Sequence, residues 1–340
     1  MYTYCAMEKV GTVCRNGKPI FVFRNRKFKP RSKKYYQWQR LYKKDLTKMY
    51  VHNKDGFDVR QYYCDPDKTY ANGYDHDFFH QLVAFLTARE KQLAHKLNGC
   101  FKYEFTNNEG VKASEKDTTN EGIKVSGTDA SGKEITPFYL RSDQFGFSAP
   151  SEERKYPYDL FIKKRSNKEA AIDQVINWIA TSRTLGGSFL WPCPFYFNYN
   201  RQRGGKVDTK RDHYIQDRVD LTLWELLYWY QDDKKRTILS SWGNKDPNLA
   251  IWLNHFGSFD TYIEFFYLDP FVRKTEQGLR PINILGIKDT SEPKWGDNGE
   301  NPSPEIKSSL EIDKLERMLK FVNDGIKKRT KKITNLLNRQ

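Results

Sequence analysis

The sequence predicts an α+β fold in which helices cover a central mixed or antiparallel sheet and a long helix comes last. Short apolar runs bounded by glycine or proline predict the strands in the middle of the chain. Apolar residues that recur at helical spacing before and after those runs predict the covering helices. Between Ile312 and Leu336 the apolar residues recur close to every seventh position, which is typical of a long helix.

Charge divides the 340 residues into three regions. Residues 1–54 carry a net charge of +13 and residues 311–340 carry +5, whereas the part between them is slightly acidic. We therefore predict a basic N-terminal extension (1–54), an α+β core domain (55–290) and a basic C-terminal helix (305–340). Aromatic residues make up 15% of the chain, which supplies ample material for a core despite the high charge.

The cysteines and the hydropathy limit the class of protein. Five cysteines are widely spaced without a CxxC pair, which argues against a disulfide framework and against a cysteine zinc site. No apolar run approaches the roughly 20 residues that a membrane helix needs, and the first residues lack the apolar region of a signal peptide. We expect a soluble cytoplasmic protein without a membrane partner.

The basic N-terminal extension mixes cations with aromatic residues. Residues 17–30 interleave apolar and basic side chains, which predicts a strand. In residues 31–44, cations would bind phosphates and aromatic rings would stack on unpaired bases of RNA or single-stranded DNA. The residues expected to make these contacts are Lys33, Lys34, Tyr35, Tyr36, Trp38 and Arg40. The alternative is a solvated lysine-rich arm, or one that docks on an acidic protein.

A segment rich in aspartate and histidine follows, between residues 58 and 80. His76 and His80 lie four residues apart, so on a helix they share a face and could hold one metal ion. Turn and helix-cap chemistry explains the aspartates equally well, and we assign no metal ligands. The helix that begins near Phe78 has apolar residues at core spacing: Phe79, Leu82, Val83, Leu86, Leu93 and Leu97.

Three further segments precede the central stretch of the chain. Residues 106–136 are poor in apolar side chains and predict a surface hairpin, a mobile loop or an insertion without chemistry. Residues 137–147 return to the composition of a strand. Residues 168–183 predict an amphipathic helix, and Gly186 could end it as a left-handed cap.

The stretch from Thr184 to Tyr230 has the pattern strand, polar loop, helix. Residues 188–192 form a short apolar run, and residues 198–218 are dense in Arg, Asn, Gly and Asp. Charged loop residues on a rigid frame are where functional sites are usually found, so we expect the site in this stretch.

The helix after this loop is predicted to begin near Leu221. Asp220 or Thr222 could cap it, and Thr222 with Glu225 fits a capping box. In this interpretation Glu225 completes the start of the helix.

The rest of the chain adds helices and one short strand. Residues 247–256 and 259–267 predict two aromatic-rich helices, and residues 281–286 predict a short buried strand. The last helix would pack on the body of the protein or on a second copy of the chain, and it could also carry a protein partner. Its basic tail, residues 327–332, predicts a solvated face or a contact with phosphate.

Short motifs follow one another in a fixed order between residues 56 and 268. They are FD (57–58), DPD (65–67), FH (79–80), NG (98–99), YL (139–140), TLGG (184–187), WP (191–192), NxxRG (200–204), IxDRxDLTLxE (215–225) and FxxYxxFFxL (259–268). In this order they resemble an uncharacterised bacterial family, a domain of unknown function often found in mobile or accessory gene neighbourhoods. The likeness is most specific over residues 185–225, and the chain departs from it in the longer spacing between Asp67 and His80. The resemblance implies a shared core and, by analogy, an accessory, defence-like role without an established activity.

Seven polar residues in this region are the candidates for chemistry: Asn200, Arg203, Asp217, Arg218, Asp220, Glu225 and Asp143. An arginine near the start of a helix can bind phosphate or carboxylate as a bidentate fork. Asp217 could orient Arg203 or act as a base, and Asp143, on a strand, could approach the same place. We assign catalysis to Arg203, Asp217, Arg218, Asp143 and Glu225 and substrate binding to Asn200. The alternative is that these residues only hold the loop together.

Three functions remain open from the sequence. The first is an intracellular bacterial effector, of toxin or phage-defence type, that binds or acts on nucleic acid, with RNA favoured. The second is an NAD-using ADP-ribosyl transferase, with an arginine of the loop on the pyrophosphate and an acid stabilising the ribosyl cation. The third is a non-enzymatic adaptor whose basic ends bind a partner. No GxSxG or P-loop motif supports a serine hydrolase or a P-loop nucleotide site, and no cofactor is identified.

Overall fold

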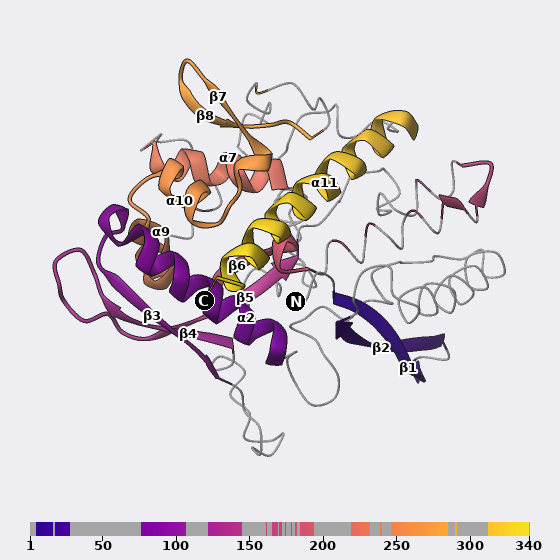
Figure 1. The fold of residues 1–340 in the computed structure, drawn as a ribbon, viewed down its shortest axis with the longest axis horizontal. Coiled ribbons are helices and arrows are strands. Elements are labelled where there is room, and N and C mark those ends of the chain that lie inside the picture. The colour runs from indigo at the N-terminus through magenta and orange to yellow at the C-terminus, as the bar shows by residue number, and fades with distance from the viewer. Residues whose placement is uncertain are drawn as a thin grey trace.

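The structure is a computed structural model. It describes residues 5–15, 18–27, 76–106, 122–144, 184–193, 219–231, 246–284 and 312–339, with isolated positions between 161 and 181 and at 239 and 290. Helices and antiparallel sheets are both present, and a long helix comes last (Figure 1). The predicted α+β class is therefore confirmed.

The strands form one four-stranded sheet and two hairpins. The four-stranded sheet is antiparallel with the order β3-β4-β5-β6, in which β3 is Cys100–Thr106, β4 Gly122–Thr128, β5 Phe138–Gln144 and β6 Ser188–Cys193. The hairpins join β1 (Cys5–Arg15) to β2 (Lys18–Lys27) and β7 (Val272–Thr275) to β8 (Gly278–Pro281). The strand expected within residues 17–30 is β2.

Five longer helices have bounds within the described residues, and Figure 1 shows them packed together with the four-stranded sheet. They are α2 (His76–Leu93), α7 (Val219–Tyr230), α9 (Pro247–His255), α10 (Phe259–Phe265) and α11 (Ile312–Leu337). The C-terminal half of α11 lies beside α2. Side chains from α2, the four-stranded sheet, α7, α9, α10 and α11 belong to one hydrophobic core.

Helix α2 and strand β3 follow the periodicity of their apolar residues. The buried positions of α2 include Phe79, Leu82 and Leu86, as the helical spacing predicts. In β3, Phe101 and Tyr103 are buried whereas Lys102 and Glu104 are exposed, because successive side chains of a strand point to opposite faces. The sheet therefore has one face in the core.

Strand β4 lies inside the segment predicted to be a polar hairpin, loop or insertion. Ile123 and Val125 are fully buried and pair with β3 and β5 on either side. The hairpin alternative holds for Gly122–Thr128, although this strand is central rather than superficial. Two apolar residues at alternate positions are enough to bury one face of a strand, and the low average apolar content of the segment concealed them.

Strand β6 confirms the strand predicted at residues 188–192. Pro192 lies within it, opposite Leu140 of β5. Among the described strands β6 is at the edge of its sheet, where a proline without an N–H can be accommodated. Before this strand, every described position between Lys168 and Thr181 is helical, as expected.

Gly186 is not the left-handed cap that the sequence predicted. It lies in a short 3₁₀ turn, Leu185–Gly187, and positive φ values occur at other glycines. Glycine is needed here because α11 approaches so closely that there is no room for a side chain. A Cβ atom at Gly186 would lie 2.3 Å from the Thr330 Oγ1 atom and 2.6 Å from the Ile326 carbonyl oxygen.

The start of α7 also differs from the prediction. The helix begins at Val219, so Thr222 is its fourth residue and cannot be the N-cap. The Asp220 carboxylate accepts a hydrogen bond from the Ile284 N–H at 3.1 Å. The strand expected at residues 281–286 does not continue through residues 282–284, because β8 ends at Pro281 and the Ile284 N–H bonds to α7 instead of to a neighbouring strand; residues 285 and 286 lie outside the described residues.

Helices α9 and α10 confirm the two predicted aromatic-rich helices. Each begins with a side-chain cap: the Asp246 carboxylate accepts from the Asn248 N–H, and the Ser258 hydroxyl accepts from the Thr261 N–H. No described helix is both long enough and apolar enough to cross a membrane.

The apolar seam of α11 faces the body of the protein. Leu319, Val322, Ile326 and Ile333 are fully buried in the common core. Of the two arrangements expected for this helix, packing on the body is the one that the structure shows.

Candidate functional site

Most of the residues proposed from the sequence as functional lie outside the described residues. These are Lys33, Lys34, Tyr35, Tyr36, Trp38, Arg40, Asn200, Arg203, Asp217 and Arg218. Their roles stay predictions. The positions of Asp143 and Glu225 can be described.

Asp143 and Glu225 lie on two different elements of the core. Asp143 is in β5, where its backbone is paired with Phe189 of β6. Glu225 is fully buried in α7, and its carboxylate accepts a hydrogen bond from the Leu239 N–H at 3.2 Å. Glu225 thus ties the chain around Leu239 to α7, and its proposed catalytic role stays a prediction.

A buried polar cluster joins α2, β3 and α9. The Glu90 carboxylate accepts hydrogen bonds from the Phe101 N–H at 2.8 Å and from the Tyr103 hydroxyl at 2.9 Å. It also lies 3.0 Å from the Nε2 atom of His255, whose Nδ1 atom lies 2.9 Å from the Asn98 carbonyl oxygen. The His255 ring stacks on Phe101 with 3.7 Å between the ring centroids.

The hydrogen-bond partners of His255 determine how many protons His255 and Glu90 hold together. The Asn98 carbonyl can only accept, so Nδ1 must carry a proton and donate it. Nε2 and the Glu90 carboxylate then need one further proton between them, as imidazolium with carboxylate or as imidazole with carboxylic acid. Burial, and then the negative charge of Glu90, raise the pKa of Tyr103 well above its usual value, so its hydroxyl remains a donor. The cluster is satisfied internally, which indicates a structural role.

We expect Glu90→Gln to destabilise the protein much less than Glu90→Ala. Glutamine keeps an acceptor for the Phe101 N–H and can donate to a neutral His255 ring, so only the Tyr103 hydroxyl loses its acceptor. Alanine leaves Phe101, Tyr103 and His255 without this partner and should lower the free energy of unfolding by about 2–3 kcal/mol. Urea unfolding of the two variants would measure this difference. Equal losses for both would show that the hydrogen bonds of Glu90 are not what stabilises the cluster.

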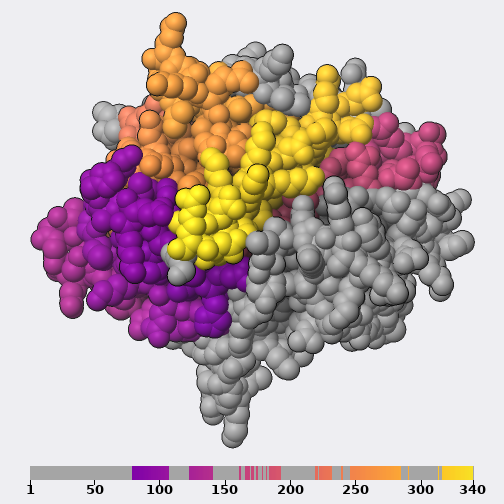
Figure 2. All heavy atoms as spheres, viewed as in Figure 1, coloured from indigo at the N-terminus to yellow at the C-terminus, as the bar shows by residue number. Residues whose placement is uncertain are grey.

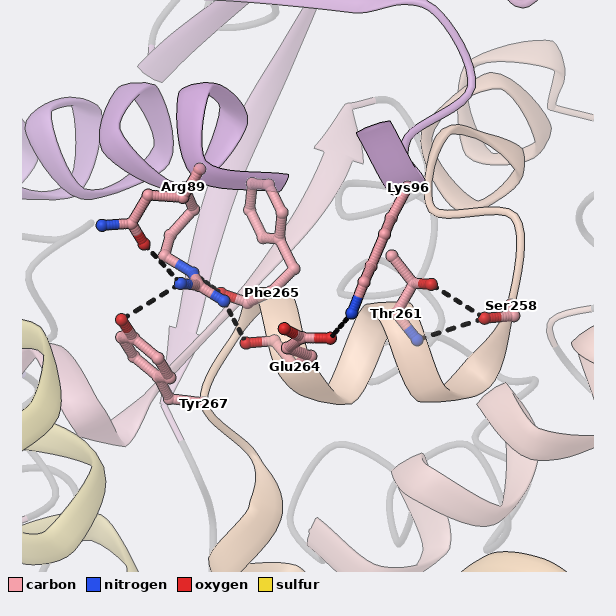
Figure 3. Close-up of polar contacts among 8 residues, drawn as sticks. Arg89, Lys96, Ser258, Thr261, Glu264, Phe265 and Tyr267 are labelled. Carbon is pink, nitrogen blue, oxygen red and sulfur yellow. Dashed lines mark hydrogen bonds and ion pairs between the residues drawn. The ribbon is translucent and has the colours of Figure 1, made fainter. Parts of the chain in front are cut away.

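The C-terminus of α10 carries a second polar cluster, in which two arginines bind backbone carbonyls. The Arg89 Nε atom of α2 donates to the Phe265 carbonyl at 3.0 Å, and its Nη2 atom donates to the Glu264 carbonyl at 2.7 Å (Figure 3). The Arg329 Nε atom of α11 donates to the Phe266 carbonyl at 2.7 Å. The last carbonyls of a helix lack partners inside it, and arginines from both sides supply them here.

Arg329 also joins α10 to the start of β6. Its Nη1 atom donates to the Gly186 and Ser188 carbonyls, both at 2.8 Å, and only 2% of the residue is exposed. Burial lowers the pKa of its guanidinium to about 9, so it stays charged at neutral pH. Arg329 therefore stabilises the interior of the protein and is not available to a ligand.

The side of α11 opposite Arg329 is exposed and carries several cations. Lys327, Lys328, Lys331, Lys332 and Arg339 are all exposed, and we call them the α11 basic face. The sequence has no acid between residues 325 and 340. Figure 2 shows α11 in yellow at the surface, between α2 in purple and the orange residues that follow α7.

Only part of this charge is neutralised within the described residues. The Lys332 ammonium lies 2.6 Å from the Asp269 carboxylate, and the Lys327 ammonium lies 3.9 Å from that of Asp324. For Lys328, Lys331 and Arg339 the described part of the chain supplies no ion pair. At 1.5 Å per residue, the face from Lys328 to Arg339 is about 16 Å long, enough to follow several phosphates of one strand.

The described residues contain no group of three or more acidic, histidine or cysteine side chains that could hold a metal ion. His80 is exposed at its end of α2, and its ring packs edge-on against Phe105. The side chain of His76 lies outside the described part of the structure. The α11 basic face is thus the described surface with the clearest chemical preference, and that preference is for anions.

Comparison with known proteins identifies an uncharacterised domain within the chain. Residues 130–294 match a family of unknown function (DUF6994). The uncharacterised domain expected from the sequence is confirmed at this level, while the particular motif order stays a prediction. No curated protein and no solved structure matches the chain. The DUF6994 match includes the elements from β5 to β8, and α2 and α11 lie outside it.

The sequence reasoning missed Glu90, Arg89 and Arg329. For Arg329 a signal was present, because it continues the alternating three- and four-residue spacing of Val322, Ile326 and Ile333. A cation on such a seam indicates a buried guanidinium with backbone partners. For Arg89 and Glu90 the partners are up to 178 residues away, and no local pattern identifies them.

Proposed function

We propose that this protein binds nucleic acid, with single-stranded RNA as the favoured ligand, through phosphate contacts with the α11 basic face. The observation that carries this proposal is the row of exposed cations Lys328, Lys331 and Arg339, which have no ion-pair partner among the described residues. Cations on one face bind a phosphate backbone by Coulomb attraction and release of counterions.

The burial of the apolar seam of α11 favours a polyanion over a membrane as the ligand. A membrane-bound amphipathic helix inserts its apolar side among the lipids. The apolar side of α11 is fully buried at Leu319, Val322, Ile326 and Ile333, so only its polar side is available. A contact made by that side alone is electrostatic.

The basic N-terminal extension supports a single-stranded ligand. Residues 31–44 combine cations with aromatic side chains, a composition suited to unpaired bases. If the protein also cut or modified the bound RNA, it would be an effector of toxin or phage-defence type. The resemblance to the bacterial family supports this role.

Charge reversal on the α11 basic face tests the proposal. We expect the triple variant Lys328→Glu, Lys331→Glu, Arg339→Glu to lose at least tenfold in affinity for a fluorescent single-stranded RNA at low salt. The slope of log affinity against log salt concentration should also fall, by up to about 2, because each lost contact with a single strand removes about 0.7. Fluorescence anisotropy over a series of salt concentrations measures both quantities.

The matched control makes the same change of charge elsewhere. Lys102, Lys133 and Lys274 are exposed on β3, on the turn after β4 and on β7, and their replacement by glutamate should change binding much less. Equal losses in both triple variants would show that net charge alone attracts RNA and would contradict the proposed face. If the triple variant of the α11 basic face kept its affinity for RNA and lost only its affinity for an acidic polypeptide, the adaptor function would replace this proposal.

A further inference from the structure

Tyr267 occupies a backbone conformation that usually belongs to glycine. Its φ is 52°, and it is the only residue other than glycine with a positive φ in the described part of the chain. The Tyr267 N–H donates to the Glu264 carbonyl and the Leu268 N–H donates to the Ile263 carbonyl, which is the Schellman pattern at the end of α10. A side chain at this position costs about 1 kcal/mol in backbone strain relative to glycine. The contacts of the tyrosine ring must offset this strain, and one of them is with Phe85 of the core, whose ring centroid lies 6.0 Å away.

The ring of Tyr267 is held in one orientation by Arg89. The Arg89 guanidinium lies 4.3 Å from the centre of the ring, and its Nη1 atom donates to the Tyr267 hydroxyl at 3.1 Å. Arg89 is itself fixed by its bonds to two carbonyls of α10 and to the Gln92 side chain (Figure 3). A ring that is already ordered loses little conformational entropy when a ligand packs on it.

Tyr267 lies at the border of the α11 basic face and is partly exposed. The Lys332 ammonium of that face is 5.8 Å from the centre of the ring. The same ammonium pairs with the exposed Asp269 carboxylate, two residues beyond Tyr267. An aromatic ring and a row of cations thus lie next to one another on one surface.

We propose that Tyr267 is a stacking platform for an unpaired base of a strand whose phosphates bind the α11 basic face. This inference rests on the proposed function and names the class of ligand for that surface. Bases stack on aromatic rings beside cationic grooves in proteins that bind single strands. The bases of a duplex are paired and stacked on each other, so the ligand would be a single strand or an RNA loop.

The experiment compares an intact single-stranded oligonucleotide with an abasic one of the same length. Both have the same phosphates, so the ratio of their affinities reports base contacts. We expect the protein to bind the intact strand at least tenfold more tightly, since one stacked base contributes about that much. Tyr267→Asn should reduce the ratio about tenfold, because asparagine tolerates the left-handed conformation but has no stacking ring, and any preference that remains is that of the N-terminal aromatic residues. Tyr267→Phe keeps the ring and should keep most of the ratio.

The outcomes separate this inference from the proposed function. If the protein binds neither strand, the proposed function fails. If it binds the intact strand better and Tyr267→Asn leaves the ratio unchanged, Tyr267 is not the platform although the basic face still binds phosphate. The unfolding temperature of Tyr267→Asn is measured as a control and should remain close to that of the unchanged protein. Tyr267→Gly also lacks the ring and removes the backbone strain, so it provides a second variant for the same comparison.

Discussion

Arg329→Met is expected to lower the free energy of unfolding by about 3 kcal/mol. The change leaves three buried carbonyls, those of Phe266, Gly186 and Ser188, without their guanidinium donor. Each unpaired buried group costs about 1–3 kcal/mol. Part of that cost is offset because the variant no longer buries a charge, whose desolvation lowers the pKa of Arg329. The carbonyls outweigh this gain, because all three remain buried. Urea unfolding measures the loss.

Lys328→Met is the matched control for this prediction. It removes a neighbouring cation from the exposed side of the same helix, so the expected change in stability is within about 0.5 kcal/mol. Similar losses in both variants would show that the charge of α11, rather than its bonds to carbonyls, stabilises the protein. Arg329→Lys should fall between the two, because an ammonium is a point charge that cannot reproduce the fork of a guanidinium.

Gly186→Ala is expected to have a comparable effect, a loss of about 3 kcal/mol or more, for a steric reason. The new Cβ atom would lie 2.6 Å from two backbone atoms of α11, the Ile326 carbonyl oxygen and the Thr330 nitrogen. Backbone atoms cannot rotate away, so the helix must shift and part of the core around Ile326 must open. Thermal unfolding, compared with circular dichroism of the folded state, would show the loss.

Gly132→Ala provides the control for that substitution. Gly132 has a φ of +80° and no atom within 4 Å of an added Cβ, so alanine there adds only backbone strain of about 1–2 kcal/mol. If Gly186→Ala were no worse than Gly132→Ala, the close packing of α11 on the turn before β6 would be contradicted.

Elements with strong periodicity could be predicted from the sequence. The seam of α11, the buried positions of α2 and the strand before Pro192 all follow from the spacing of apolar residues. Strand β4 was harder, because two buried residues in a polar segment give a weak signal. The strand predicted at residues 281–286 does not extend over residues 282–284, where the Asp220 carboxylate, 64 residues away in sequence, binds the Ile284 N–H.

The candidate surface was predictable only in outline. Basic residues at 327–332 are visible in the sequence, and the helical spacing of the apolar seam was the one signal that separates Arg329, which is buried, from its exposed neighbours Lys328 and Lys331. No such signal marked Tyr267. Its left-handed backbone and its contact with Arg89 depend on how α2 packs against α10. Long-range partners of this kind leave no local pattern.

The packing of α11 also bears on the order of folding during synthesis. A chain emerges from the ribosome in N-to-C order, and α11 comes after every other described element. Until α11 arrives, the Phe266, Gly186 and Ser188 carbonyls lack the guanidinium of Arg329, and the apolar surface that α11 covers is open to water. Nascent chains that stop short of Ile312 should therefore remain sensitive to protease and depend on chaperones until α11 has been released and has packed.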